Sequence, residues 1–317
     1  MTEHLVPADA REISGRPTSD AWNLVWVADP EFVWETEWVG ELLAGIRANH
    51  SVNPRLSEVS GRSVIVFSEN GRDASHSATV GACIKRLARA GDLRGLIHLS
   101  DEWYGAPLTH YADAPFVIRV GHWSAWLDPK ILTVPIGLSS AFVRSAGAAD
   151  SRPVKPAGER RFCWSFLGQL HSKPTRSAMI GAFASIPKGY IFETFRWNDP
   201  CRLTDANYRE ILSESVFSLC PRGWSTEGNQ TVDSFRTYES ADSGAIPLVD
   251  SAYYADAFGA PFPILRPDWN DGPELVRGLC ADPSALHALQ TRCHEWWRRY
   301  RRECAAAVRD HICRFTV

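Results

Sequence analysis

VFSLCPRGWSTEGNQTVDSFRTYESADSGAIPLVD, from Val216 to Asp250, is the most informative stretch of this chain. It starts with a short apolar run, VFSLC, and continues into a glycine-containing loop that carries Arg222. A helix-like segment with Arg236 and Glu239 follows, and the stretch closes on a second apolar run, AIPLV. This order predicts a strand, a helix and a second strand, which is the repeating unit of a mostly parallel sheet.

The loop and the start of the helix predict an anion site. The first N–H groups of a helix have no partners within it, so a helix N-terminus favours negative charge. Arg222 and Arg236 can both face that anion, and a diphosphate is the natural candidate. Glu239 follows Arg236 on the same helix face, where a carboxylate can accept hydrogen bonds from ribose hydroxyls. A surface ion pair between Arg236 and Glu239, with a solvated Arg222, is the alternative.

The same alternation extends over the whole chain. Apolar runs predict strands at 24–27, 63–67, 95–99, 116–120, 131–137, 161–168, 189–195, 216–220 and 245–249. Amphipathic segments predict helices at 35–49, 75–91, 175–186, 204–215 and 231–244, and 283–315 predicts one long helix or two. Strands that alternate with helices indicate an α/β fold in which a ligand sits at the carboxyl ends of the strands.

A break in this pattern predicts two α/β domains. Residues 146–160 are rich in Ala, Gly, Pro and charge and have no apolar periodicity, so we expect an interdomain linker there. The first domain is then 18–145, after a flexible N-terminus at 1–17, and the second is 161–282. Residues 283–317 form a C-terminal helix that we expect to pack across the domain junction.

Composition excludes several classes of protein. The 317 residues carry a net charge of −3, which gives no case for a nucleic-acid binder. The eight cysteines contain no C-x-x-C pair, and scattered thiols indicate a reducing compartment. No signal peptide and no apolar stretch of membrane-spanning length is recognisable, so we expect a cytoplasmic protein. G-x-G-x-x-G, G-x-x-x-x-G-K-[ST], G-x-S-x-G, H-E-x-x-H and D-x-D are all absent, which argues against a dedicated Mg²⁺ or Mn²⁺ site.

The central stretch also resembles a known family. CPRG followed by DSFR-x-Y-E and GAIPLV is similar to the signature of the exostosin-like inverting glycosyltransferases. Upstream, SFLGQLHSKPTRSAMI resembles that family's strand ending in glycine and its arginine-bearing helix, matching Gly168 and Arg176. HLSDEWYG and VPIGL resemble, less closely, the ribitol xylosyltransferase branch.

The resemblance implies a GT-B fold, with two Rossmann-like domains, the acceptor side first and the nucleotide-sugar side second. It implies a nucleotide diphosphate sugar donor, with a UDP-sugar as the first expectation, used in polysaccharide biosynthesis. Transfer would go with inversion, without an essential metal or other cofactor, to a hydroxyl of a glycan or polyol-phosphate acceptor. A sugar or nucleotide-sugar binding protein without catalysis is the alternative. The donor-binding residues that we expect are Gly168, Lys173, Arg176, Arg222, Gly223, Thr226, Asp233, Ser234, Phe235, Arg236 and Glu239.

An inverting transferase needs a general base on the acceptor side. Asp101 and Glu102 directly follow the strand-like run at 95–99, where the carboxyl end of the sheet is expected, and His122 follows the next run. The structural alternative is that Asp101 caps a turn and Glu102 is solvated. The aromatic residues expected to stack on the acceptor sugar are Trp103, Tyr104 and Trp123.

Two further features have mainly structural interpretations. Arg119 lies inside a strand-like run and needs a partner such as Asp101, whereas His98 is expected to be a satisfied core residue. The tail WWRRYRRE, at 296–303, predicts a terminal helix that packs its aromatic side chains while arginine faces water. Attraction of this tail to anionic lipid at the inner face of the membrane is the weaker alternative.

Overall fold

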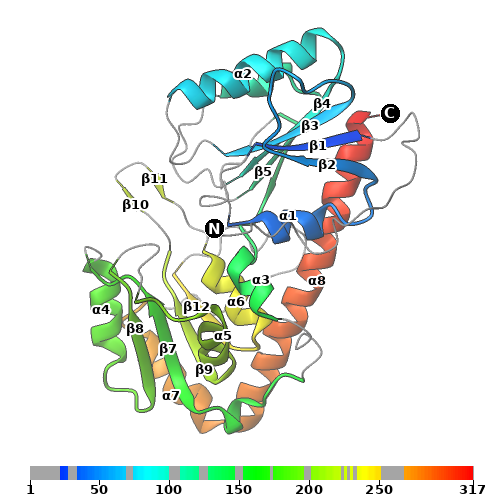
Figure 1. Cartoon of the computed structure of the whole chain (residues 1–317). Coiled ribbons are helices and arrows are strands. Elements are labelled where there is room, and N and C mark those ends of the chain that lie inside the picture. The colour runs from blue at the N-terminus through cyan, green and yellow to red at the C-terminus, as the bar shows by residue number, and fades with distance from the viewer. Residues whose placement is uncertain are drawn as a thin grey trace.

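The computed structural model describes twelve stretches of the chain: 22–27, 34–68, 74–99, 108–120, 128–146, 153–171, 174–195, 201–222, 225–226, 229–230, 234–250 and 268–316. Two sheets of parallel strands, each with helices on its faces, make up the fold (Figure 1). The α/β class predicted from the alternation of strands and helices is confirmed.

Six parallel strands form the first sheet, in the order β2-β1-β3-β4-β5-β6. Their bounds are β1 Trp22–Val27, β2 Ala48–Val52, β3 Ser63–Ser68, β4 Leu93–Leu99, β5 Val117–Val120 and β6 Ile131–Val134. Alternate residues of β3 enter two different cores: Val64 and Val66 on one face, Ile65 and Phe67 on the other. Such strands read as continuous apolar runs because both faces of a parallel sheet are covered.

Helices cover the two faces of the first sheet. Helix α2, Ala74–Arg89, lies over one face (Figure 1) and buries Val80, Cys83, Ile84 and Leu87, the spacing expected of an amphipathic helix. Helix α1, Thr36–Leu42, packs with the other face.

The sequence pattern misplaced the end of the first helix. A helix was expected at 35–49, but α1 ends at Leu42 and the chain enters β2 six residues later. Gly45 between them has φ +90°, a left-handed conformation that glycine adopts readily and that stops a helix. Strand β2 was missed because its sequence, ANHSV, is mostly polar, as an exposed edge strand can be.

Four parallel strands form the second sheet, in the order β12-β9-β7-β8. Their bounds are β7 Phe162–Gly168, β8 Gly189–Glu193, β9 Ser215–Cys220 and β12 Ile246–Val249. Two short antiparallel strands, β10 Ser225–Thr226 and β11 Asn229–Gln230, lie between β9 and β12 in sequence. The helices are α4 Pro174–Phe183, α5 Asp205–Ser213, α6 Phe235–Asp242 and α7 Gly272–Ala281. Thr204 caps α5, because its Oγ1 accepts a hydrogen bond from the N–H of Asn207 at 3.2 Å.

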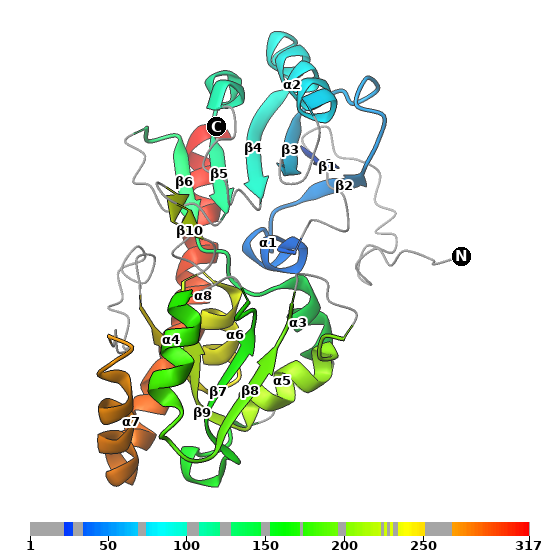
Figure 2. The ribbon, with the colours of Figure 1, turned by 90° about the vertical axis from the view of Figure 1, so that its left-hand side faces the viewer.

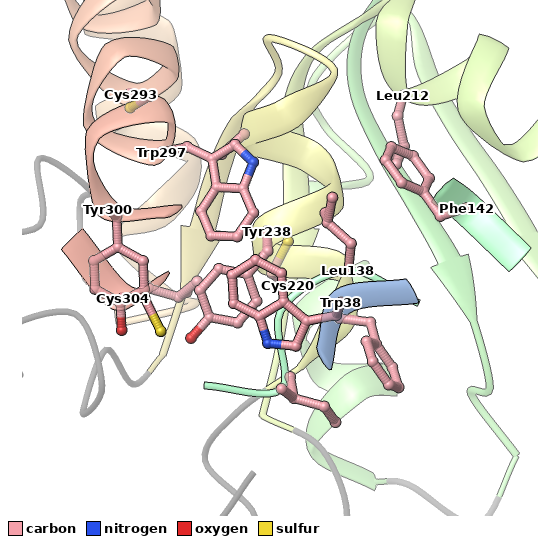
Figure 3. Close-up of a cluster of buried hydrophobic side chains, with 14 of the residues drawn as sticks. Trp38, Leu138, Phe142, Leu212, Cys220, Tyr238, Cys293, Trp297, Tyr300 and Cys304 are labelled. Carbon is pink, nitrogen blue, oxygen red and sulfur yellow. The ribbon is translucent and has the colours of Figure 1, made fainter. Parts of the chain in front are cut away.

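The C-terminal helix α8, Pro283–Thr316, is a single helix that runs along both lobes (Figures 1 and 2). Its Trp297 stacks on Trp38 of α1 with ring centroids 5.7 Å apart and contacts Tyr238 of α6 at 5.1 Å (Figure 3). Arg301 does not simply face water: its guanidinium bonds Glu41 of α1 at 2.8 Å and Asp242 of α6 at 2.9 Å. Aromatic packing and ion pairs therefore hold α8 to both halves of the chain.

Two described segments lie between the sheets in the chain. Helix α3, Ser140–Ala146, follows β6, and 153–160 pack against the second sheet. Arg160, 6% exposed, donates to the carbonyl groups of Ser215 at 2.7 Å and Ser243 at 3.1 Å. Among the helices that the structure describes, none has an apolar stretch long enough to cross a membrane.

Candidate functional site

Three neighbouring strands of the second sheet end at the same edge because they are parallel. Gly168 ends β7, Cys220 ends β9, and Asp250 directly follows β12. Ligands of open α/β sheets bind at the carboxyl ends of the strands, so this edge is the place to look for a site. Arg176, Arg222 and Arg236 meet here, and we call these three residues the arginine cluster.

Arg236, in the first turn of α6, lies against the end of β7. A Cβ atom at Gly168 would collide with its Nη2, so only glycine leaves the guanidinium its place. Its Cζ lies 4.9 Å from the ring centroid of Phe166, within cation–π range. Among the described residues, Nε of Arg236 has no hydrogen-bond acceptor although it is buried. A buried guanidinium with a donor that still needs an acceptor is suited to bind an anion.

Arg176, on α4, connects the ends of two strands. Its Nη1 donates to the carbonyl of Gln169 at 3.0 Å and its Nη2 to the carbonyl of Arg222 at 3.1 Å. The side chain is 9% exposed, and burial, together with the charge of Arg236, lowers the pKa of Arg176 to about 10. Arg176 still carries its charge at neutral pH, close enough to Arg236 for the two charges to repel. An anion between them would relieve that repulsion.

Arg222, just beyond β9, pairs with Asp250. Its N–H donates to Oδ1 at 2.9 Å and its Nε lies 3.4 Å from Oδ2. Asp250 was not among the expected site residues, although its position directly after a strand is the same signal that singled out Asp101. The arginine cluster thus has three positive charges against Asp250 and, one turn further along α6, Glu239. Glu193, which ends the neighbouring strand β8 beside Gly168, is a third carboxylate at this edge.

Glu239 is 3% exposed and bonded on both carboxylate oxygens. Oε1 accepts the hydroxyl of Ser139 at 2.5 Å and its N–H at 3.3 Å, and Oε2 accepts the hydroxyl of Tyr208 at 2.7 Å. Burial raises the pKa of Glu239, while these hydrogen bonds and the charge of Arg236 oppose the rise. The alternative of a surface ion pair between Arg236 and Glu239 is therefore wrong, because this carboxylate is buried.

The structure describes part of the expected donor set. Gly168, Arg176, Arg222 and Arg236 come together, with Glu239 one turn from Arg236. Ser234 directly precedes α6, and Phe235 is the first residue of that helix, with 9% of its surface exposed. The backbone of Thr226 lies in β10. The other expected site residues lie outside the described residues: Asp101, Glu102, Trp103, Tyr104, His122, Trp123, Lys173, Gly223 and Asp233.

Several polar side chains are buried together near the ends of β4 and β5 in the first sheet. The ring Nδ1 of His98 and the hydroxyl of Tyr111 lie 2.5 Å apart, and His98 stacks on Phe67 at 4.7 Å. The expectation that His98 lies in the core is confirmed, and its Nδ1 is bonded to Tyr111. Arg119, fully buried, is paired in register with His98, and its Cζ lies 5.8 Å from the Tyr111 ring centroid. Its expected partner Asp101 lies outside the described residues.

Sequence reasoning did not identify Ser139 and Tyr208. They lie 100 and 31 residues from Glu239, and no local pattern links them to it. No group of three or more His, Cys, Asp or Glu side chains suited to hold a metal ion occurs in the part of the chain that the structure describes.

The sequence of the chain was compared with those of known proteins. No family model matches the chain. Its sequence is similar to "Ribitol-5-phosphate xylosyltransferase 1" of Homo sapiens and of Mus musculus, with 22% identity over an alignment of 207 residues that covers 58% of this chain and 44% of each relative. The chain thus matches less than half the length of these relatives.

Solved structures resemble the chain over most of its length. An alpha1,3-fucosyltransferase aligns over 89% of this chain and 85% of its own, with TM-score 0.55 and 12% identity. An alpha-glucosyltransferase in complex with UDP and a 13-mer DNA containing an HMU base aligns over 92% and 99%, with TM-score 0.60 and 9% identity. With its two parallel sheets, each flanked by helices, the chain has the GT-B fold found among glycosyltransferases.

Proposed function

We propose that this protein is an inverting glycosyltransferase. It transfers a sugar from a nucleotide diphosphate sugar, most simply a UDP-sugar, to a hydroxyl of a glycan or polyol-phosphate acceptor. The observation that carries this proposal is the arginine cluster, in which Arg236 lies against Gly168 with a buried Nε that has no acceptor among the described residues. Similarity to a ribitol-5-phosphate xylosyltransferase and the GT-B fold support it.

Stabilising the leaving group is the role we assign to the arginine cluster. Negative charge develops on the diphosphate as the bond to the sugar breaks, and cations held in place lower the barrier without reorganising. Arg236 and Arg176 already repel each other across this edge, so a diphosphate between them is favoured by both charges. The start of α6 adds its dipole. Fixed cations of this kind do what a metal ion does in other transferases, and the reaction we propose uses no metal.

The attacking hydroxyl needs a base on the other side of the sugar. Asp101, Glu102 and His122 remain our candidates, since β4 ends at Leu99 and β5 at Val120, just before these residues in sequence. Trp103, Tyr104 and Trp123 are the proposed acceptor-stacking residues. DNA is bound by the alpha-glucosyltransferase neighbour, but the net charge of −3 here favours a glycan or polyol phosphate over nucleic acid.

A binding and transfer experiment tests the proposal. Calorimetry should show UDP binding, and Arg236→Ala should weaken it by about 1.5–3 kcal/mol, the scale of a hydrogen bond to a charged group. Arg55→Ala is the control, because Arg55 is an exposed surface residue paired only with Glu58 in the described structure. Transfer from a panel of nucleotide sugars then separates an enzyme from a binding protein without catalysis. Equal UDP affinity in wild type and Arg236→Ala would contradict the site.

A further inference from the structure

Glu239 receives hydrogen bonds from two elements far apart in sequence. Ser139 directly precedes α3, in the segment that leaves the first sheet, and contributes both its hydroxyl and its N–H. Tyr208 belongs to α5 and contributes its hydroxyl. Three donors on one carboxylate that is 3% exposed hold it in a single orientation.

One acceptor position of Glu239 has no partner in the part of the chain that the structure describes. A carboxylate has about four lone-pair sites. Ser139 occupies two of them on Oε1, and Tyr208 occupies one on Oε2. Oε2 can therefore accept one more hydrogen bond, one helical turn beyond Arg236, whose charge acts on Glu239.

The two donors are themselves anchored by shared packing. Arg209, next to Tyr208, donates to the carbonyl of Phe142 at 3.0 Å and to the hydroxyl of Ser145 at 3.2 Å. Its Cζ lies 3.7 Å from the ring centroid of Phe142, and the Tyr208 ring meets Phe142 edge-on at 6.4 Å. Helix α3 is thus bound to α5, and Ser139 and Tyr208 keep their places relative to each other.

We propose that Ser139 and Tyr208 are positioning residues: they orient the Glu239 carboxylate so that Oε2 accepts a hydrogen bond from a ribose hydroxyl of the donor nucleotide. This inference rests on the proposed function, since it requires a nucleotide at the arginine cluster. It makes the site select nucleotides that carry ribose hydroxyls. Neither positioning residue needs to touch the diphosphate.

The inference predicts a change in pH dependence. A ribose hydroxyl donates best to an ionised carboxylate, so UDP affinity should fall as Glu239 is protonated. Burial raises the pKa of Glu239, and the donors on it oppose that rise. Removing the Tyr208 hydroxyl therefore lets the pKa rise further, and the fall in UDP affinity should begin at a higher pH. The titratable or charged groups acting on Glu239 here are Tyr208, Arg236 and the Cys220 thiol.

The experiment measures binding of two ligands, UDP and 2′,3′-dideoxy-UDP, by calorimetry across a pH series. Tyr208→Phe and Ser139→Ala should each lower UDP affinity about fivefold to tenfold, the scale of one ordinary hydrogen bond, because the carboxylate stays in place and loses only its fixed orientation. Affinity for the dideoxy ligand should not change. Tyr190→Phe on β8 and Ser213→Ala, whose hydroxyl donates only to its own helix, are the matched controls and should change neither affinity.

The outcomes separate this inference from the function beneath it. If Tyr208→Phe and Ser139→Ala lose the same affinity for UDP and for dideoxy-UDP, the two residues have a merely structural role. If UDP affinity and its pH midpoint stay unchanged in both variants, the positioning role is refuted. Suppose that wild type binds UDP and needs Arg236 to do so. If wild type, Tyr208→Phe and Ser139→Ala then all show the same ratio of UDP affinity to dideoxy-UDP affinity, the inference alone fails. If wild type binds no nucleoside diphosphate, the proposed function fails with it.

Discussion

Replacing Gly168 with alanine tests how the arginine cluster is built. The new methyl group would occupy space now held by Nη2 of Arg236, so the guanidinium must move away from the end of β7. Gly168 also has φ +154°, a conformation that residues with a side chain rarely adopt. We therefore expect two separate effects, one on the stability of the fold and one on nucleotide binding.

The structure sets the size of each effect. Arg236 can yield at the flexible end of its side chain, so the fold should lose only about 1–2 kcal/mol, the usual cost of such a backbone conformation for a residue other than glycine. Binding should suffer more, because a displaced guanidinium gives up a charged hydrogen bond worth about 1.5–3 kcal/mol, or about 10-fold to 150-fold in the dissociation constant.

Calorimetry with UDP and thermal unfolding measure the two effects in the same samples. Gly181→Ala in α4 and Gly278→Ala in α7 are the controls, since a Cβ at either position meets no atom within 4 Å. Both should bind UDP normally and unfold at the same or a slightly higher temperature, because alanine favours helix. The double variant with Arg236→Ala should bind no more weakly than Arg236→Ala alone. If the double variant loses further UDP affinity by the full amount seen in Gly168→Ala, the glycine does not act through Arg236. Normal UDP binding by Gly168→Ala alone would also refute the reasoning.

Three further predictions concern stability. Trp297→Ala should lower the free energy of unfolding by about 3–5 kcal/mol, because the side chain is fully buried at the junction; urea unfolding measures this, and a loss under about 1 kcal/mol would contradict it. Cys163 and Cys280 have Sγ atoms 3.8 Å apart, so diamide should join them and stabilise the chain by about 2–4 kcal/mol; Cys280→Ser should abolish the gain, and a gain that survives points to another pair. Lys155 holds the pKa of Glu214 below its usual value through bonds of 2.8 Å. That pair is partly exposed, so Glu214→Gln should cost under about 1 kcal/mol at pH 7, and the difference from wild type should vanish as pH falls through the pKa of the folded state; a difference that persists in acid would exclude this cause.

Local sequence signals predicted most of the strands and several helices. The apolar runs at 63–67 and 216–220 became β3 and β9, and the helix around Val80 ends near Gly91, which has φ +71°. The same signals failed for the polar edge strand β2 and for α3, a helix that was not predicted and that ends where the expected linker begins. None of the side chains of β2 is fully buried, so this strand carries neither an apolar run nor a regular alternation that periodicity could reveal.

Arg222 and Arg236 could be selected from the sequence because they flank the expected start of a helix that follows a strand, and Arg176 because it matches the arginine-bearing helix of the family that the sequence resembles. What the sequence could not reveal is contact between residues distant along the chain. The place of Arg236 against Gly168, the pairing of Arg222 with Asp250, and the bonds from Ser139 and Tyr208 to Glu239 exist only after folding. Periodicity and turn chemistry describe neighbours in sequence, whereas these contacts depend on how whole elements pack. The sequence therefore determined the elements and the charges at their ends, and the tertiary structure alone decided which of those charges meet and which are already bonded.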